Sequence, residues 1–196
     1  KKMKEILDKM FILTKDSLVN QTSKMRSKIS NYEQITDNIQ KEVTVFLCKV
    51  MEKSMSEHQS LQSQSIIKIV DEFESIADYL ERISNYIFKL GEKDINDKSL
   101  NEFKEFQDEV WGFFQTCCID FIENHPVDID GLQKKSEELR LWADDMRDKH
   151  ISRVSKGKYD PLTALIYSDM VVALRKIRAH SMNVSEAVLM HQQERN

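Results

Sequence analysis

Glycine and proline are scarce in this sequence, which has 4 glycines and 2 prolines among 196 residues. An average chain of this length would carry roughly 23, at about 7% glycine and 5% proline. Residues 1–90 contain neither, although tight turns depend on these two residues together with asparagine and aspartate. The scarcity argues against a sheet protein, a Rossmann fold or a glycine-rich phosphate loop, and it favours a bundle of long helices.

Three further absences narrow the class of protein. No run of about 18 apolar residues occurs, so the sequence contains no candidate for a membrane-spanning helix. The net charge of −4 argues against nucleic acid as the main partner, because phosphate binding needs a concentrated basic surface. The three cysteines, Cys48, Cys117 and Cys118, lack Cys-x-x-Cys spacing, which is typical of buried thiols in a reducing compartment.

Apolar residues recur at helical spacing in six segments, namely residues 3–20, 35–55, 61–90, 99–125, 130–154 and 162–191. The polar stretches Ser56–Ser60 and Asn96–Ser99 are predicted to connect them, as is the turn Gly157–Pro161. Ser99 and Glu102 have the spacing of a capping box, and Gly91 stands where a C-cap glycine belongs. The sequence therefore predicts an all-α protein of six long antiparallel helices.

Two pairs of similar stretches indicate an internal repeat. Asp37–Lys41 resembles Asp130–Lys134 at an offset of 93 residues, and Phe73–Ile76 resembles Leu174–Ile177 at an offset of 101. Because the order of helix lengths also repeats, we expect one domain built from two tandem three-helix bundles with a pseudo-twofold repeat. The expected bundles are residues 1–92 and 98–196.

Gly112 lies inside the fourth helical segment, where glycine is unfavourable. Close packing against a neighbouring helix would explain a glycine at this position.

Acidic side chains line one side of the third segment. Glu74 and Asp78 are four residues apart, Glu81 follows three residues later, and Asp71 continues the same side. Carboxylates at this spacing repel each other unless a cation offsets their charge. Two interpretations remain open: oxygen ligands for a hard or borderline cation, or a solvated face on which Asp78 pairs with Arg82.

The sixth segment carries basic residues followed by other polar residues. The stretch Arg175–Arg178 could bind an anion, or it could be the solvated flank of a buried helix. His180, Asn183 and Glu186 recur every three residues and can share one face. A single histidine is more often a structural hydrogen-bonding group than a metal ligand. None of the five histidines stands in a serine or cysteine context typical of a catalytic nucleophile, which argues against an enzyme.

Together these motifs resemble the PhoU-like domains, which are two tandem three-helix bundles with similar segments in their third and sixth helices. Phe73–Ile83 resembles the first copy of that segment, and Leu174–Val184 resembles the second. Glu42–Leu47 is similar to a stretch in the second helix of the cytosolic C-terminal domains of bacterial sodium-dependent phosphate cotransporters. The resemblance covers essentially the whole chain.

The resemblance implies a regulatory or interaction domain of a sodium-dependent phosphate transporter, or a PhoU-type regulator of phosphate uptake, and not an enzyme. It implies a membrane phosphate transporter as partner, in the N-terminal part of the same full-length chain. The expected location is the cytoplasmic side of the inner membrane, as part of a larger membrane protein whose present fragment is soluble. A homodimer is a further expected assembly.

Some PhoU-like proteins bind metal clusters through Glu-x-x-x-Asp pairs in both repeats. Here only Glu74 and Asp78 keep the pair, because Arg175 and Ala179 stand at the second-repeat positions. The resemblance thus implies at most a divalent or iron cation at Glu74 and Asp78, and Arg175 is expected to neutralise the acidic face instead. Two other functions stay open: a metal-binding protein or metal-dependent enzyme that uses the third-segment carboxylates, and a plain helical oligomerisation module.

Overall fold

The computed structural model describes residues 1–53, 55–91, 97–123, 125–155 and 161–193. These residues contain no strand and form six helices: α1 (Lys2–Ser17), α2 (Ser23–Met51), α3 (Glu57–Leu90), α4 (Asp97–Glu123), α5 (Ile129–Ser155) and α6 (Pro161–Gln193). The predicted all-α class is confirmed. The expected linker residue Asn96 and residues 157–160 of the expected turn lie outside the described residues.

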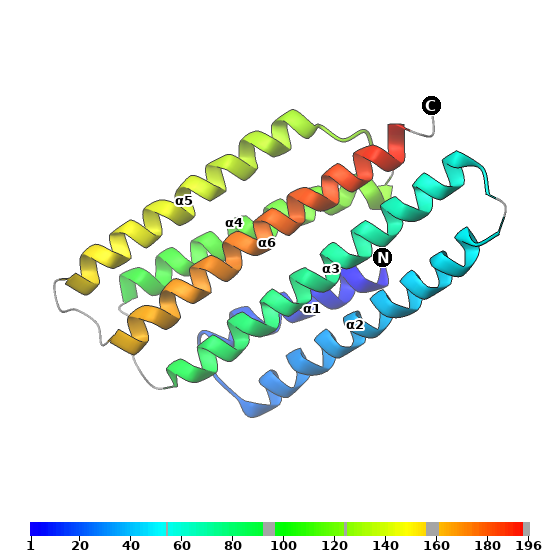
Figure 1. Ribbon diagram of the computed structural model, residues 1–196. Coiled ribbons are helices and arrows are strands. Elements are labelled where there is room, and N and C mark those ends of the chain that lie inside the picture. The colour runs from blue at the N-terminus through cyan, green and yellow to red at the C-terminus, as the bar shows by residue number, and fades with distance from the viewer. Residues whose placement is uncertain (54, 92–96, 124, 156–160, 194–196) are drawn as a thin grey trace.

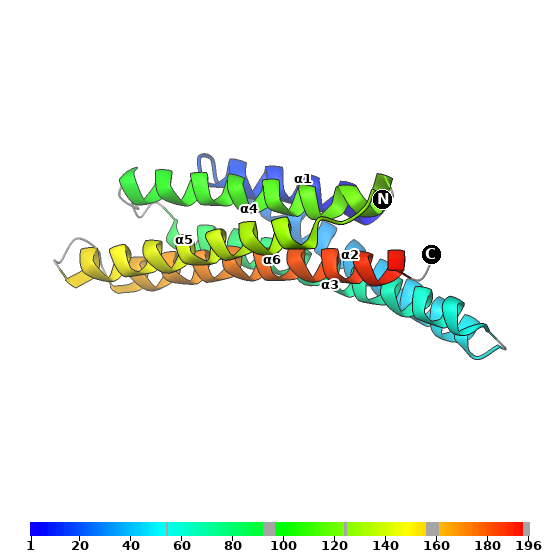
Figure 2. The same cartoon turned by 90° about the horizontal axis from the view of Figure 1, so that it is seen from above.

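The helices are arranged in two layers (Figures 1 and 2). α1 and α4 form the smaller layer, and α5, α6, α3 and α2 lie in that order in the larger one. α1 packs on α2 and α3, α4 packs on α5 and α6, and α3 and α6 are neighbours in the middle of the larger layer. Two groups of three helices therefore meet along α3 and α6.

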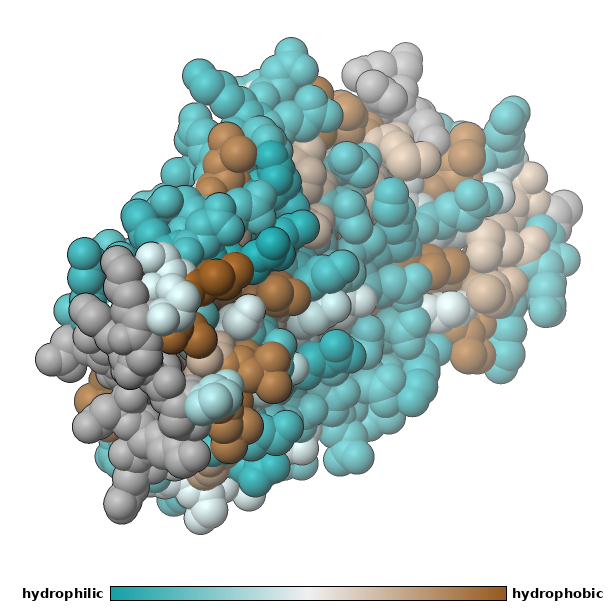
Figure 3. All heavy atoms as spheres, turned by 60° about the vertical axis from the view of Figure 1, so that its left-hand side comes forward, coloured by the Kyte–Doolittle hydropathy of each residue, from teal (hydrophilic) through white to brown (hydrophobic). Residues whose placement is uncertain are grey.

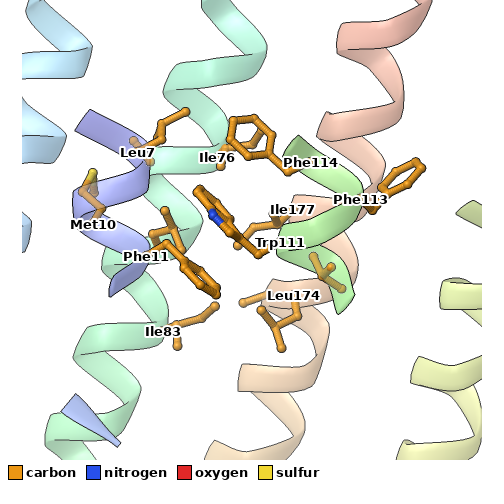
Figure 4. Packing of buried hydrophobic residues seen from close by; sticks show 14 of the residues in the cluster. Leu7, Met10, Phe11, Ile76, Ile83, Trp111, Phe113, Phe114, Leu174 and Ile177 are labelled. Atoms are coloured by element: carbon orange, nitrogen blue, oxygen red, sulfur yellow. The ribbon is translucent and has the colours of Figure 1, made fainter. Parts of the chain in front are cut away.

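One continuous hydrophobic core fills the space between the layers (Figure 4). Phe11 on α1 stacks on Trp111 on α4, with ring centroids 4.3 Å apart and planes 4° from parallel. Trp111 also contacts Phe114, at 4.6 Å between centroids. Aliphatic side chains from both central helices surround this stack, namely Ile76, Ile83, Leu174 and Ile177. The two groups of helices thus share a core, and large aromatic side chains join them.

The start of α3 differs from the sequence prediction. Ser56 Oγ accepts a hydrogen bond from the backbone N–H of Gln59 at 3.2 Å, and Gln59 Oε1 accepts one from the Ser56 N–H at 3.1 Å. This reciprocal capping box begins the helix at Glu57, so most of the polar stretch predicted as a turn is helical. At the other end Gly91 has φ +58°, which confirms it as the glycine that ends α3.

The predicted capping box at Ser99 and Glu102 is wrong. α4 begins at Asp97, so both residues lie inside the helix. Arg153 on α5 contacts both of them: Nη1 donates to Ser99 Oγ at 2.7 Å, and Nη2 donates to both carboxylate oxygens of Glu102 at 2.9 Å. This largely buried arginine ties the end of α5 to the start of α4.

α2 and α3 extend well past the N-terminal end of α1 (Figure 2). α1 has 16 residues, whereas α2 has 29 and α3 has 34. The stripe predicted to be apolar on α2 is therefore only partly covered: Val43 and Val50 are half-buried, and Phe46 is 64% exposed. The residues of α2 that are fully buried, Ile29 and Thr36, lie nearer to its start.

Gly112 does not pack closely against a neighbouring helix, contrary to the sequence prediction. A Cβ atom placed on it would meet no atom within 4 Å outside its own stretch of helix. Instead Gly112 lines a groove of about 490 Å³ between α4 and the start of α5, together with Phe113 and Leu132.

The surface at the end where α5 meets α6 is mainly hydrophilic, with hydrophobic side chains in separate patches (Figure 3). Ile151, Leu162 and Leu165 are exposed in this region of the chain. Within the described part of the chain, none of the helices combines the length and the hydropathy that a membrane crossing requires.

Candidate functional site

The two segments singled out in the sequence meet where α3 and α6 run side by side in opposite directions (Figure 1). His180 Nδ1 lies 2.7 Å from Glu72 Oε2, and Asn183 Nδ2 donates a hydrogen bond to Glu72 Oε1 at 3.0 Å. The ring of Tyr79 lies 5.5 Å from the His180 ring. With Glu72 ionised, its oxygens can only accept, so the imidazole donates from Nδ1. We call Glu72, Tyr79, His180 and Asn183 the α3–α6 cluster.

Two of the three polar residues predicted to share a face of α6 join this cluster. His180 and Asn183 bind the same carboxylate, whereas Glu186 is exposed. The sequence interpretation missed Glu72, because it lies off the line of carboxylates that begins at Asp71. Glu72 and Tyr79 are seven residues apart, which places them on one face of a helix, and this spacing could have identified the face that meets α6.

A second group of polar side chains lies between α2 and α3. It contains the predicted residues Glu74, Asp78 and Glu81 of α3 and two carboxylates of α2, and we call it the acidic strip: Glu33, Asp37, Glu74, Asp78 and Glu81. The α2 pair has the same Glu-x-x-x-Asp spacing as the α3 pair, a signal that the sequence interpretation did not use.

Two cations offset part of the charge of the acidic strip. Arg82 pairs with Asp78 at 2.6 Å, as the solvated-face interpretation predicted, and Lys41 pairs with Asp37 at 2.7 Å. Asp71, at the end of the line of carboxylates on α3, accepts a hydrogen bond from Gln40 Nε2 at 2.6 Å. The aspartates therefore have partners.

The two glutamates at the centre of the strip have perturbed acidity. Partial burial raises the pKa of Glu74, and the charges of Asp78, Asp37 and Asp71 raise it further. Burial also raises the pKa of Glu33, and the charges of Glu81 and other carboxylates of the strip raise it by a smaller amount. Among the described residues, neither glutamate side chain has a hydrogen-bond or ion-pair partner. Each is thus an incompletely compensated negative charge.

Carboxylate oxygens are suitable ligands for hard cations and for iron, so the donor chemistry of the strip fits a metal ion. The arrangement fits less well. Within the described ranges, no three aspartate, glutamate, histidine or cysteine side chains come close enough together to hold one ion. The carboxylates would have to move toward each other before a cation could be bound.

The corresponding region of the second group of helices is charge-balanced. Arg175 Nη1 lies 3.0 Å from Asp144 Oδ1 on α5, and Arg140 Nη1 lies 2.6 Å from Oδ2 of the same carboxylate. Arg175 therefore does not pair with the acidic strip, and the expectation that it neutralises that strip is wrong. Arg178 donates to Ser136 Oγ at 2.6 Å, and burial, followed by the charge of Arg175, lowers its pKa. Arg175 and Arg178 thus contact α5, whereas Lys176 is exposed.

Comparisons with known proteins agree with this architecture. The family model of the PhoU domain matches residues 1–87. No curated protein matches the sequence. The structure is similar to that of the phosphate transport system regulatory protein PhoU from Streptococcus pneumoniae, with a TM-score of 0.75 and 12% sequence identity over 95% of this chain and 93% of that one. The chain therefore has the fold of PhoU, and its first 87 residues match the PhoU domain model.

Proposed function

We propose that this chain is a non-enzymatic regulator of phosphate uptake. The observation that carries the proposal is the PhoU domain match over residues 1–87, together with a fold similar along nearly the whole chain to a protein described as a phosphate transport regulator. The polar groups of the α3–α6 cluster bind each other across two helices. That arrangement suits a structural or conformational role better than a catalytic one.

The proposed partner is a membrane phosphate transporter, contacted from the cytoplasmic side of the inner membrane. In its most specific form, the proposal makes the chain the C-terminal domain of a sodium-dependent phosphate cotransporter, whose N-terminal part is the partner. Support for this form comes from Glu42–Leu47, which resembles a stretch in the second helix of such domains. This stretch lies on the half of α2 that extends past the N-terminal end of α1.

The test is radioactive phosphate uptake by the organism that encodes the chain. Cells without the coding segment for residues 1–196 should differ at least about twofold from the parent strain in uptake under phosphate excess. Expression of the intact segment should restore the parental rate. Unchanged uptake in the deleted strain would contradict the proposal. Uptake that is lost and then restored only when the segment is fused to a transporter would support the cotransporter form.

Cation binding at Glu74 and Asp78 is a second proposal for the same protein. Its support is the perturbed acidity of Glu33 and Glu74, because a divalent or iron cation would offset the repulsion that raises their pKa values. Such a cation would stabilise the contact between α2 and α3. Elemental analysis of protein purified without chelator tests it, with the Glu74→Gln variant as the control.

A further inference from the structure

One arginine between α5 and α6 lacks a counter-charge of its own. Arg178 lies where these two helices run side by side, and its Nη1 donates to the buried hydroxyl of Ser136 at 2.6 Å (Figure 1). Its Nε atom is buried and has no hydrogen-bond partner among the described residues. Within the same part of the chain, no carboxylate forms an ion pair with this guanidinium. A positive charge is thus held between two helices with only a neutral partner.

The carboxylates around Arg178 are already bound to other arginines. Asp144 accepts from Arg175 at 3.0 Å and from Arg140 at 2.6 Å, and both oxygens of Glu137 accept from Arg140 at 2.7 Å. These two carboxylates balance two arginines, and Arg178 adds a third positive charge. We call the whole set the α5–α6 cluster: Ser136, Glu137, Arg140, Asp144, Arg175 and Arg178.

The surroundings of Arg178 oppose its charge. Burial lowers the pKa of Arg178, and the charge of Arg175 lowers it further. An arginine nevertheless stays protonated at physiological pH, so only an anion can offset the charge. Packing alone does not require an arginine here, because Ala77, which precedes it by the repeat offset of 101 residues, is fully buried in the first group of helices. A costly charge at such a position indicates a ligand site.

The cluster has free donors that solvent can reach. Arg178 uses one N–H of its guanidinium for Ser136, and Arg175 uses one for Asp144, out of five donors in each group. The Arg175 side chain is 42% exposed, so an ion can approach from outside. Planar guanidinium groups bind phosphate and carboxylate oxygens through paired N–H donors. The cluster therefore suits a small oxyanion.

The two carboxylates decide which oxyanion fits. Inorganic phosphate at neutral pH carries at least one O–H group, which needs an acceptor. A carboxylate has about four lone-pair sites, so Asp144 can accept from phosphate while it stays bound to its arginines. Sulfate has no proton at this pH, and its oxygens would face the carboxylate with no hydrogen atom between them. The mixed charge of the α5–α6 cluster thus favours phosphate over sulfate.

We propose that the α5–α6 cluster binds one inorganic phosphate ion, held by Arg178 and Arg175, with Asp144 as acceptor for its proton. The bound ion offsets the third positive charge and strengthens the contact between α5 and α6. This inference deepens the proposed function, on which its regulatory meaning rests: a regulator of phosphate uptake would bind the ion whose transport it regulates.

The test is a nuclear magnetic resonance titration of the intact chain at pH 7 and low ionic strength, with inorganic phosphate as the probe. We expect saturable shifts in the cluster, with a Kd below about 1 mM. Arg178→Gln should weaken binding at least about tenfold, because it removes the unbalanced charge and its paired donors. Lys176→Gln is the matched control: it removes the same charge from an exposed position of α6 and should leave the Kd within about twofold. Sulfate should bind at least about tenfold more weakly than phosphate.

The location is read from the side-chain Nε–H signal of Arg178, which is protected from water in the folded protein. Phosphate bound at the cluster shifts this signal, and phosphate bound elsewhere does not. The signal decides the matter in the parent protein even if a variant fails to fold. Circular dichroism melting checks folding, and Arg178→Gln should be at least as stable as the parent protein without phosphate, because an uncompensated charge is removed.

Three outcomes would overturn the proposal. The first is the absence of saturable shifts up to about 10 mM phosphate, an affinity too weak for a specific site. The second is equal binding of sulfate. The third is an equal loss of binding in Arg178→Gln and Lys176→Gln, which would show attraction by net charge alone. Phosphate binding combined with unchanged uptake after deletion would keep this site and refute the regulatory role, whereas altered uptake without binding would refute this site alone.

Discussion

Glu72 on α3 binds His180 and Asn183 on α6 with its two carboxylate oxygens, at 2.7 Å and 3.0 Å. The carboxylate side chain is 14% exposed, so it has given up most of its contact with water. Polar groups in such surroundings need partners, and both oxygens have one. The two groups of helices are thus joined by a polar contact within a largely apolar interface.

Glu72→Ala should lower the free energy of unfolding by about 1–3 kcal/mol, because it leaves the polar groups of His180 and Asn183 without their acceptor. Urea denaturation followed by circular dichroism measures the change. Glu186→Ala is the matched control on the exposed side of α6, with an expected effect within about 0.5 kcal/mol. Equal effects of the two substitutions would show that the α3–α6 cluster contributes no stability.

The acidic strip predicts a pH dependence with a definite sign. Because the pKa of Glu74 is raised in the folded protein, the folded state binds a proton more readily than the unfolded state, whose value is near 4.5. The stability of the folded protein should therefore fall as pH rises through this range. Glu74→Gln removes the charge and should be more stable at pH 7, by about 0.2–0.5 kcal/mol for each like-charge contact relieved.

Thermal unfolding of both proteins between pH 4 and pH 7 measures the difference in stability between Glu74→Gln and the parent protein. This difference should shrink as the pH falls toward the ordinary pKa of glutamate. Glu186→Gln, outside the strip, should show no pH-dependent gap. A variant that is less stable than the parent protein at pH 7 would contradict the prediction, provided that no cation bound to the acidic strip stabilises the parent. Chelator decides this: if a bound cation is responsible, its removal lowers the melting temperature of the parent but not of Glu74→Gln.

The sequence predicted the fold because helix periodicity and helix caps are local properties. The α3 segment and its C-cap at Gly91 are examples. Ser99 shows the limit, since its spacing to Glu102 is correct for a capping box but Arg153, 54 residues away in the sequence, contacts both residues instead. The repeat offset of 93 is also misleading, because Asp37 lies in the middle of α2 and Asp130 lies in the first turn of α5.

The candidate site was predicted in part. His180 and Asn183 follow from spacing along one helix, whereas their acceptor Glu72 depends on how α3 and α6 pack. The partner of Arg175 depends likewise on the neighbouring α5. Phe46 fits the apolar periodicity of α2 and yet is exposed, because it lies on the part of α2 that extends past α1. Local patterns identify faces of helices, and the length and placement of other helices decide what covers each face.

Gly112→Ala should stabilise the protein by about 0.5–1 kcal/mol, because alanine is the better helix former and the new methyl group meets open space. Gly91→Ala should have the opposite effect on stability. Nothing crowds that position either, but its φ of +58° disfavours any residue with a Cβ atom, and the variant should lose about 1 kcal/mol. Chemical denaturation of both variants checks the pair. Destabilisation by Gly112→Ala would show that the groove between α4 and α5 closes on this glycine in solution.

The three thiols should differ sharply in reactivity. Cys48 is exposed, and Cys117 and Cys118 are buried. Burial raises the pKa of Cys118 well above the ordinary value, and the neighbouring Cys117 raises it further, so the reactive thiolate form is suppressed. We expect a thiol reagent at pH 8 to modify Cys48 rapidly in the native protein, and Cys117 and Cys118 only at the rate of unfolding. Mass spectrometry of the modified peptides measures this, and Cys48→Ser should leave no rapid phase. Fast modification of Cys117 or Cys118 in native buffer would show that α4 separates from the core on the timescale of the reaction.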